Sequence, residues 1–373
     1  MIMQISTVTC HDVYNYGASL QAYALQEYCK SLGAYYKIID YKPPYLSNHY
    51  KLDAVSNPRY DKPIIKQAYL LAKLPGRLKL LKRKRLFDDF TAKYLELTGK
   101  RYTSNEEIER DCPESDLYIA GSDQIWNTLF KNGRDPAFYL DFVKDRGRKI
   151  SYAASFATER IFNNAEAFVK NKIQNFDAIS VRESSALDLL ANLGRTDGKL
   201  VADPVFLLSR AEWMHLINNC KETGEQYILV YDCEQSAKLR ELAIELRKTK
   251  GLKIYALSST KGKYADKNFG LSGPIEFLNL ISNARYVLAN SFHALAFSLI
   301  FHKNVFITNR SEEINTRMRD FMQYLGIERY LINDVSGLRE ECINYESVDN
   351  KLNSLIADSK TFIRTQMELS INE

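Results

Sequence analysis

The sequence predicts an α/β protein built of two Rossmann-like domains. Apolar strands and amphipathic helices alternate along residues 1–205, and a second series of the same kind begins with YILVYDC. At 373 residues the chain also exceeds what one hydrophobic core usually supports. Two separate series of strands and helices in a chain of this length imply two domains.

The first series opens with a strand, a helix and a strand. The strands are MQISTVTC and YYKIIDY, and the helix ASLQAYALQEYCKSLG between them has an apolar side and ends on Gly33. A helical insert is expected at about residues 45–105, and it carries the basic run RLKLLKRKR. Further strands are expected at DLYIAG, KISYAAS and AISVRE, with a helix after the last of them. These elements make up the predicted N-terminal domain, residues 1–205.

The second series repeats this alternation. It contains the strand YILVYDC, the helix AKLRELAIELRKT, the strand KIYALS, the helix PIEFLNLIS and the segment ARYVLANSFHALAFSLIFHKNVFITN, expected to form strand, helix and strand. The domain boundary is placed in ADPVFLLSRAEW, where Asp203 and Pro204 interrupt the pattern. Residues 206–373 are therefore expected to form the C-terminal domain. Its last helix is predicted to cross back to the first domain.

The composition is that of an ordinary globular protein, with 45% hydrophobic and 26% charged residues. A formal charge of +5 is small for this length, so no nucleic acid is expected as a partner. The sequence shows neither a secretory leader nor an apolar run that could span a bilayer, and we expect a cytoplasmic protein. The basic run is expected to be a solvated helix face, with peripheral contact with the inner membrane surface or a charged glycan as the alternative.

The six cysteines are far apart and include no CxxC pair. They are expected to be reduced and mostly buried, as small apolar residues are. No metal site and no other cofactor is predicted from them.

Ligands of open α/β sheets bind beyond the carboxyl ends of the strands, so the segments after each strand are the first candidates for a site. Four such segments are polar: HDVYNYGAS, SDQIWN, RES and NSFHA. The first offers Asn15, Gly17 and Ser19 at a helix start, where Gly17 lets the backbone approach a ligand closely. It lacks both GxGxxG and the P-loop pattern, which excludes the standard dinucleotide and P-loop sites.

The segment ANSFHALAF places a histidine in the first turn of a helix. Asn290 or Ser291 is the expected N-cap, and His293 follows. The free backbone amides and the positive dipole end favour an anion at this point. An anion beside the imidazole would keep it protonated, which would make it a usable general acid near neutral pH. The alternative is a histidine that hydrogen bonds a neighbouring loop.

Two further segments offer charged groups at strand ends. In AGSDQIWN, Asp123 could accept a proton from a hydroxyl and Trp126 could form an apolar wall for a sugar ring. An Asx-turn beside a core tryptophan is the alternative. In SVRES, the guanidinium of Arg182 could hold a carboxylate or phosphate bidentately, and an internal ion pair, for instance with Asp203, is the alternative.

Taken in order, these motifs resemble those of the polysaccharide pyruvyl transferase family, including its bacterial capsule and exopolysaccharide members. The resemblance runs from about residue 10 to about residue 330 and is carried by NYGASLQAYAL, YIAGSDQIWN, ISYAASFA, ISVRESSA, ADPVFLL and NSFHALAFSLIFHKNVFI. The family often has Asp before SFH and Gly after it, where this chain has Asn290 and Ala294. The resemblance implies two domains facing each other across a cleft, similar to those of GT-B glycosyltransferases.

The resemblance also implies a reaction and roles for the candidate residues. A pyruvyl group passes from phosphoenolpyruvate to hydroxyls of a glycan, or of a nucleotide-linked or lipid-linked sugar, and forms a pyruvate ketal. His293 would be the general acid, Arg182 and Arg317 would bind the donor anion, and Asp123 would position or deprotonate the acceptor. The remaining substrate-binding candidates are Asn15, Gly17, Ser122, Gln124, Trp126, Asn290 and Ser291.

Two other functions remain open at this stage. The first is a nucleotide-sugar-dependent GT-B glycosyltransferase on the same architecture. The second is a non-catalytic carbohydrate-binding relative that keeps the fold. Fold analogy alone does not choose among them.

Overall fold

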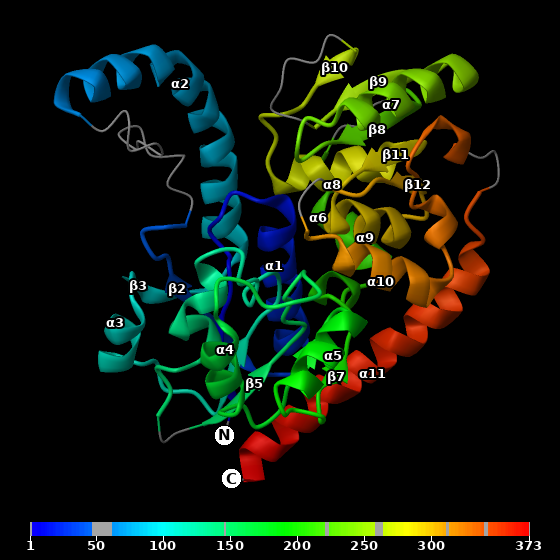
Figure 1. Ribbon diagram of the computed structural model, residues 1–373. Helices are drawn as coiled ribbons and strands as arrows, with labels where there is room; N and C mark the ends of the chain where they lie inside the picture. The colour runs from blue at the N-terminus through cyan, green and yellow to red at the C-terminus, as the bar shows by residue number, and fades with distance from the viewer. Residues whose placement is uncertain are drawn as a thin grey trace.

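The computed structural model is an α/β protein with two five-stranded parallel sheets (Figure 1). The structure describes residues 2–46, 62–144, 147–220, 224–257, 264–310, 313–338 and 342–372. One sheet belongs to each of the two series of elements that the sequence predicts. The predicted fold class is therefore confirmed.

The first sheet has the strand order β3-β2-β1-β4-β5. Its strands are β1 (Gln4–Val8), β2 (Tyr35–Tyr41), β3 (Leu97–Tyr102), β4 (Leu117–Ala120) and β5 (Arg148–Ser151). The helices of this half are α1 (Tyr16–Ser31), α2 (Pro63–Tyr94), α3 (Asn105–Arg110), α4 (Glu166–Ile173) and α5 (Ser184–Asn192). The four residues of β4 are all buried, since a central strand of a parallel sheet is covered on both faces.

The second sheet has the order β10-β9-β8-β11-β12. Its strands are β8 (Tyr227–Tyr231), β9 (Lys253–Ala256), β10 (Lys267–Asn268), β11 (Tyr286–Ala289) and β12 (Asn304–Ile307). Its helices are α6 (Arg210–Leu216), α7 (Ala237–Lys250), α8 (Pro274–Asn283), α9 (Phe292–Ile300) and α10 (Thr316–Leu325). In both sheets the fourth strand pairs with the first, as in a Rossmann half.

The structure corrects two details of the predicted first half. The helical insert at about residues 45–105 ends earlier than expected, because residues 97–102 form β3, whose LTGKRY sequence has a single buried residue and lacks an apolar run. The segment AISVRE contributes only β6 (Ser180–Val181), which pairs with β7 (Lys199–Leu200) in a small separate sheet. Residues 47–61 of the insert lie outside the described ranges.

The last helix joins the two halves. α11 (Tyr345–Asn372) packs against α10 and runs down along the first half (Figure 1). The hydroxyl of Ser359 accepts a 2.8 Å hydrogen bond from the amide of Ala202, and Arg148 Nε donates to Gln366 at 3.0 Å. The predicted crossing of the C-terminal helix is therefore confirmed.

The cysteines differ in part from the prediction. All six are free thiols, but only Cys10 and Cys29 are buried. The expectation that most of them are buried is wrong, because Cys112 and Cys220 are only partly buried and Cys233 and Cys342 are exposed, all four of them on loops. Among the described helices, none is long and apolar enough to cross a bilayer.

Candidate active site

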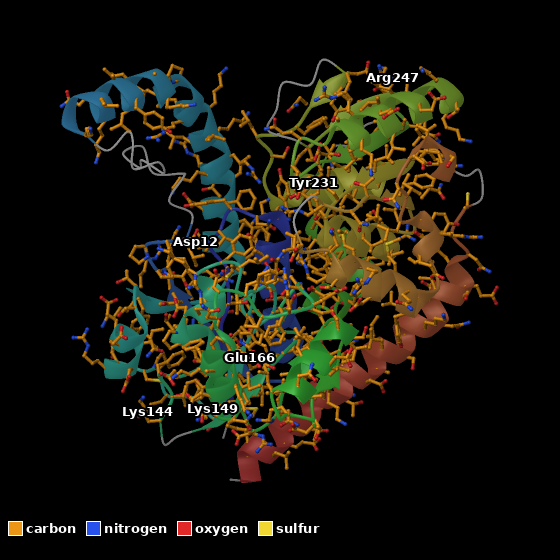
Figure 2. The ribbon with its side chains drawn as sticks, viewed as in Figure 1. Asp12, Lys144, Lys149, Glu166, Tyr231 and Arg247 are labelled. Carbon is orange, nitrogen blue, oxygen red and sulfur yellow. The ribbon has the colours of Figure 1, made fainter. Side chains whose placement is uncertain are left out.

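The loops at the carboxyl ends of the two sheets meet where the halves touch. In each sheet the loops after the first and fourth strands lie at the topological switch point, where ligands of such sheets bind. Tyr16, which opens α1 after β1, packs against Tyr231 at the end of β8, with ring centroids 5.6 Å apart. Tyr231 is labelled in Figure 2. The candidate residues of the two halves are thus brought to one place.

His293 lies in the first turn of α9, as the sequence predicts, and contacts the other half through Gly17. A Cβ atom at position 17 would lie 1.9 Å from Nδ1 of His293, so the imidazole fits only against glycine. Nε2 lies 3.6 Å from Oδ2 of Asp203, which is an ion-pair distance and too long for a hydrogen bond. Among the described residues, Nε2 has no hydrogen-bond partner. The imidazole is positioned by both halves and keeps one nitrogen available.

Asp203 is a site residue that the sequence suggested only as a partner for Arg182. Its carboxylate is buried and accepts hydrogen bonds from Arg182 at 2.5 Å and from the amide of Val205 at 3.2 Å. Burial raises its pKa, but the charges of His293 and Arg182 outweigh that effect and hold the pKa well below its usual range. Asp203 therefore stays ionised beside His293. The signal in the sequence was the single aspartate of ADPVFLL.

Arg182 is the centre of an ion-pair network. Its guanidinium donates to Asp203 at 2.5 Å and to Oδ1 of Asp123 at 2.9 Å, and its side chain has no exposed surface. The two carboxylates pair with Nη1 and Nη2, whereas Nε has no hydrogen-bond partner among the described residues. The structure therefore shows the internal ion pair that was the alternative for Arg182, and its binding of the donor anion stays a prediction.

Arg317, at the start of α10, is also buried but is less completely paired. Its Nη1 lies 3.7 Å from Oδ1 of Asp123, and its Nε has no hydrogen-bond partner among the described residues. With the amide oxygen of Gln124 turned toward the guanidinium, Gln124 accepts from Nη2 at 2.5 Å and from Nη1 at 3.0 Å. Burial and the charge of Arg182 lower the pKa of Arg317 to about 10. An incompletely compensated buried cation favours an anionic ligand at this point.

Asp123 lies between the two arginines. Its backbone has a φ of 72°, in the left-handed region, and this turn directs its carboxylate to Arg182. Burial raises its pKa, but the charges of Arg182, His293 and Arg317 hold the pKa below its usual range. A carboxylate that resists protonation is a weak proton acceptor. The geometry therefore favours positioning over deprotonation as its role.

Trp126 does not reach the site. It is fully buried, its ring stacks on Tyr139 at 5.5 Å between centroids, and its indole nitrogen donates to the carbonyl of Phe138 at 3.0 Å. The interpretation of Trp126 as a wall for a sugar ring is wrong, because no face of the ring is exposed. The alternative of a core tryptophan holds.

The remaining predicted residues shape the loops. Asn15 caps α1 by accepting from the amide of Gly17 at 2.9 Å, and Ser122, which is buried, donates to the carbonyl of Ala153 at 2.8 Å. Asn290 accepts a 2.8 Å hydrogen bond from the amide of Cys233 and so ties the loop after β11 to the loop after β8. Ser291 occupies the N-cap position of α9, but its hydroxyl makes no capping bond.

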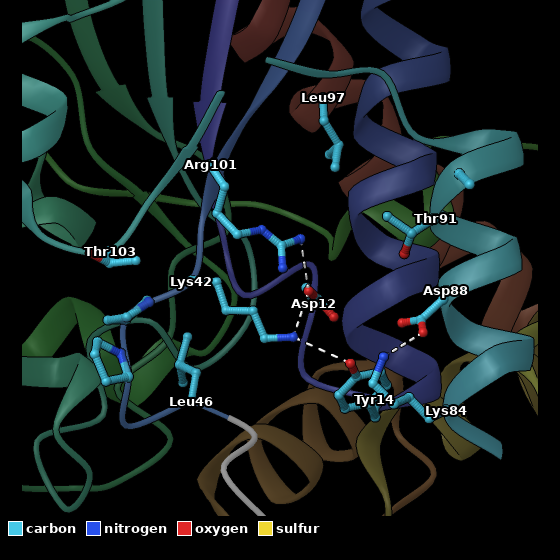
Figure 3. Close-up of a pocket in the computed structure, with 13 residues that line it drawn as sticks. Asp12, Tyr14, Lys42, Leu46, Lys84, Asp88, Thr91, Leu97, Arg101 and Thr103 are labelled. Atoms are coloured by element: carbon cyan, nitrogen blue, oxygen red, sulfur yellow. Dashed lines mark hydrogen bonds and ion pairs between the residues drawn. The ribbon is translucent and has the colours of Figure 1, made fainter. Parts of the chain in front are cut away.

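A pocket of about 680 Å³ opens beside the loop after β1 (Figure 3). Charged groups line it: Lys42 donates to Asp12 at 2.6 Å, and Arg101 donates to the same carboxylate at 3.2 Å. Tyr14 adds an aromatic side, and Lys84 of α2 lies beyond it. Asp12 and Tyr14 belong to the loop that leads into Asn15 and Gly17, so one loop contributes both to this pocket and to the contact with His293.

A family model described as polysaccharide pyruvyl transferase matches residues 15–312. The chain belongs to the polysaccharide pyruvyl transferase family. The match includes the segments that carry Asp123, Asp203 and His293, whereas Arg317 lies beyond it. The resemblance seen in the sequence is thereby confirmed.

Solved structures show the same architecture in more distant proteins. The UDP complex of MnaA from S. aureus has a TM-score of 0.53 at 12% identity, covering 100% of this pyruvyl transferase family member and 97% of its own chain. A UDP-N-acetylglucosamine 2-epimerase from Rickettsia bellii has a TM-score of 0.47 at 13% identity, covering 99% and 97%. At such identities the likeness shows the fold alone, and that fold is of the two-domain GT-B type. Among proteins with curated functions, none matches the chain.

Proposed function

We propose that this protein transfers a pyruvyl group from phosphoenolpyruvate to hydroxyls of a glycan or glycan precursor and forms a pyruvate ketal, as part of polysaccharide synthesis. The proposal is carried by the surroundings of His293. In a chain of this family, Nε2 of its imidazole has no hydrogen-bond partner among the described residues and lies 3.6 Å from a carboxylate that stays ionised. Such a group is suited to deliver a proton to a substrate.

The reaction of an enol phosphate needs such a proton at the start. Protonation of the CH2 carbon by His293 forms a C–H bond and leaves an oxocarbenium-like centre at C2. A sugar hydroxyl attacks C2 and releases its proton, and the phosphate then leaves with the electrons of its C–O bond. A second hydroxyl attacks C2, loses its proton and closes the ketal. Of the two hydroxyl protons released, one restores the imidazole and the other leaves with the phosphate. No oxidant or reductant enters this balance.

The donor anion would bind at Arg317. This arginine is buried, its Nε has no hydrogen-bond partner among the described residues, and its charge is only partly balanced by Asp123 at 3.7 Å. A phosphate or carboxylate would complete its bidentate fork. The start of α9 would add backbone amides near the same anion. Arg182 would act indirectly, by holding Asp123 and Asp203 in place.

The acceptor would enter the pocket that Asp12, Lys42, Lys84 and Arg101 line. Carboxylates and cations that alternate around a pocket suit the hydroxyls of a sugar, and a phosphate of a linked carrier would meet the cations. This pocket borders the loop that contacts His293 through Gly17.

The test is incubation of the protein with phosphoenolpyruvate and a panel of free, nucleotide-linked and lipid-linked glycans, followed by mass spectrometry. We expect a pyruvyl adduct on a subset of the acceptors and release of phosphate in equal amount. In a matched reaction, nucleotide sugars replace phosphoenolpyruvate as the donor. Glycosyl transfer in that reaction, without any pyruvyl adduct, would establish the glycosyltransferase alternative instead.

A further inference from the structure

The first part of α2 stands away from the body of the protein. Figure 1 shows that α2 changes direction along its length, and Pro75 lies inside the helix, where it removes a backbone hydrogen bond and favours a bend. The second part packs on the protein: a Cβ atom at position 273, before α8, would lie 2.8 Å from Cβ of Leu86. Residues 65–81 are the part of the helix that projects.

The projecting part exposes a row of leucines. Leu71 is 69% exposed, Leu78 50% and Leu74 37%. Of the twelve large apolar side chains that are exposed in the described ranges, five lie on α2. Leu70, Leu74, Leu78 and Leu81 follow one another at intervals of four, four and three residues, and Leu71 lies beside them, so they form one stripe along the helix. We call these five residues the leucine stripe.

The same segment is uniformly basic. Residues 62–81 contain five basic residues and no acidic one: Lys62, Lys66, Lys73, Arg77 and Lys79. The next basic residues lie on the part of α2 that packs on the protein, where Arg83 lies over the ring of Tyr16 and Lys84 pairs with Asp88. The whole chain, in contrast, has 51 basic and 46 acidic residues. The positive charge of the molecule is thus concentrated on the helix that exposes the leucines.

We propose that the leucine stripe and its flanking basic residues dock on a bilayer that contains anionic lipid. The leucines would enter the boundary between headgroups and acyl chains, and the long basic side chains would reach the lipid phosphates. The exposed leucines match the apolar interior of such a bilayer, and the basic side chains match its negatively charged headgroups. The helix lies on the membrane and does not cross it, since no described helix is apolar enough to span a bilayer.

The docking has a consequence for the acceptor if the proposed function holds. Lys84 and Thr91 of α2 line the pocket beside Asp12. A bilayer bound to the first part of α2 would therefore lie near the mouth of that pocket. An acceptor carried by a lipid would reach the site without leaving the membrane. The docking itself does not depend on the transferase activity.

The experiment uses the full chain and sedimentation with vesicles of phosphatidylcholine, with or without phosphatidylglycerol. We expect binding to the anionic vesicles that weakens at high salt and little binding to the neutral ones. The double variant Leu71→Gln/Leu78→Gln should bind about tenfold more weakly, because two leucines no longer enter the bilayer. The matched control is Leu369→Gln/Ile371→Gln on α11, which changes side chains that are 41% and 69% exposed. It should bind as the wild type does.

Several results would overturn the proposal. One is wild-type protein that stays in solution with anionic vesicles, and another is equal binding by the leucine variant and the wild type. Gel filtration completes the test. If the leucine variant elutes as a smaller species and neither protein binds vesicles, the stripe is an interface between copies of the chain. Circular dichroism confirms that both variants fold, since glutamine is a good helix former.

Discussion

At the scale of the residue, the imidazole of His293 is fixed between Gly17 and Asp203. A His293→Gln variant keeps a similar size and one hydrogen-bonding group, so it should fold and keep most of its affinity for phosphoenolpyruvate. Its turnover should fall about 100-fold or more, because no proton donor remains. Steady-state rates of both proteins check this, and a folded variant with unchanged turnover contradicts it.

The partner of this histidine gives a second prediction. Because the pKa of Asp203 is held well below its usual range, its negative charge is present throughout the assay range, 3.6 Å from Nε2 of His293. Asp203→Asn removes the charge that positions this imidazole, so turnover should fall about tenfold. The variant also leaves Arg182 with one carboxylate fewer, which costs about 3–5 kcal/mol of stability.

The control for Asp203→Asn is Asp197→Asn, whose carboxylate pairs with Arg195 at the surface and is 58% exposed. Its turnover should match that of the wild type. Thermal unfolding shows at which temperatures each variant is folded for the assay. An Asp203→Asn variant whose turnover also equals that of the wild type would mean that the carboxylate is structural only.

The two buried arginines should respond differently to substitution by lysine. Arg182 already donates to two carboxylates, so Arg182→Lys should mainly lower the thermal midpoint. Arg317→Lys should weaken phosphoenolpyruvate binding about tenfold, because an ammonium group cannot replace a bidentate fork. Calorimetric titration and thermal unfolding of both variants separate the two roles. The reverse pattern would return Arg182 to the donor site.

At the scale of the element, regular alternation made the strands and helices around the site predictable. The helix α9 begins where SFH follows an apolar strand, and the prediction of His293 in its first turn depends only on local sequence. The strand β3 was missed because its sequence is half polar. Local sequence also left two interpretations open for Trp126, and only its packing on Tyr139 chose between them.

The helix α11 gives a prediction at this scale, because it fastens the second half to the first. Ile363 lies fully buried on it, next to Phe362, whose ring is 6.5 Å from that of Tyr152 in the first half. Ile363→Ala should lower stability by about 2–5 kcal/mol, since it removes buried methyl groups and leaves a cavity. Ser354→Ala, at an exposed position of the same helix, should change stability little. Equal unfolding midpoints of the two variants would show that α11 does not hold the halves together.

At the scale of the whole molecule, the site depends on contacts that no local pattern contains. Arg182 pairs with Asp123 and Asp203, which are 59 and 21 residues away along the chain. Whether Arg182 binds a ligand or pairs with these carboxylates depends on how the loops after β4 and β6 pack together in the folded protein. The sequence could therefore indicate which loops form the site, but not which charges are already balanced within it.

This assembly from both halves gives the last prediction. A donor that contacts Arg317 of one half and the loops of the other binds only the native state, so it should stabilise that state by mass action. At a phosphoenolpyruvate concentration about 100 times its Kd, the gain is about 2.7 kcal/mol, and the thermal midpoint should rise without added metal. Arg317→Lys should show a smaller rise at the same concentration, because its donor site is incomplete. UDP is the matched comparison ligand. Only a ligand that the native site recognises can shift the unfolding equilibrium. A rise of the thermal midpoint with UDP and none with phosphoenolpyruvate would therefore indicate that the protein is a nucleotide-sugar-dependent enzyme and not a pyruvyl transferase.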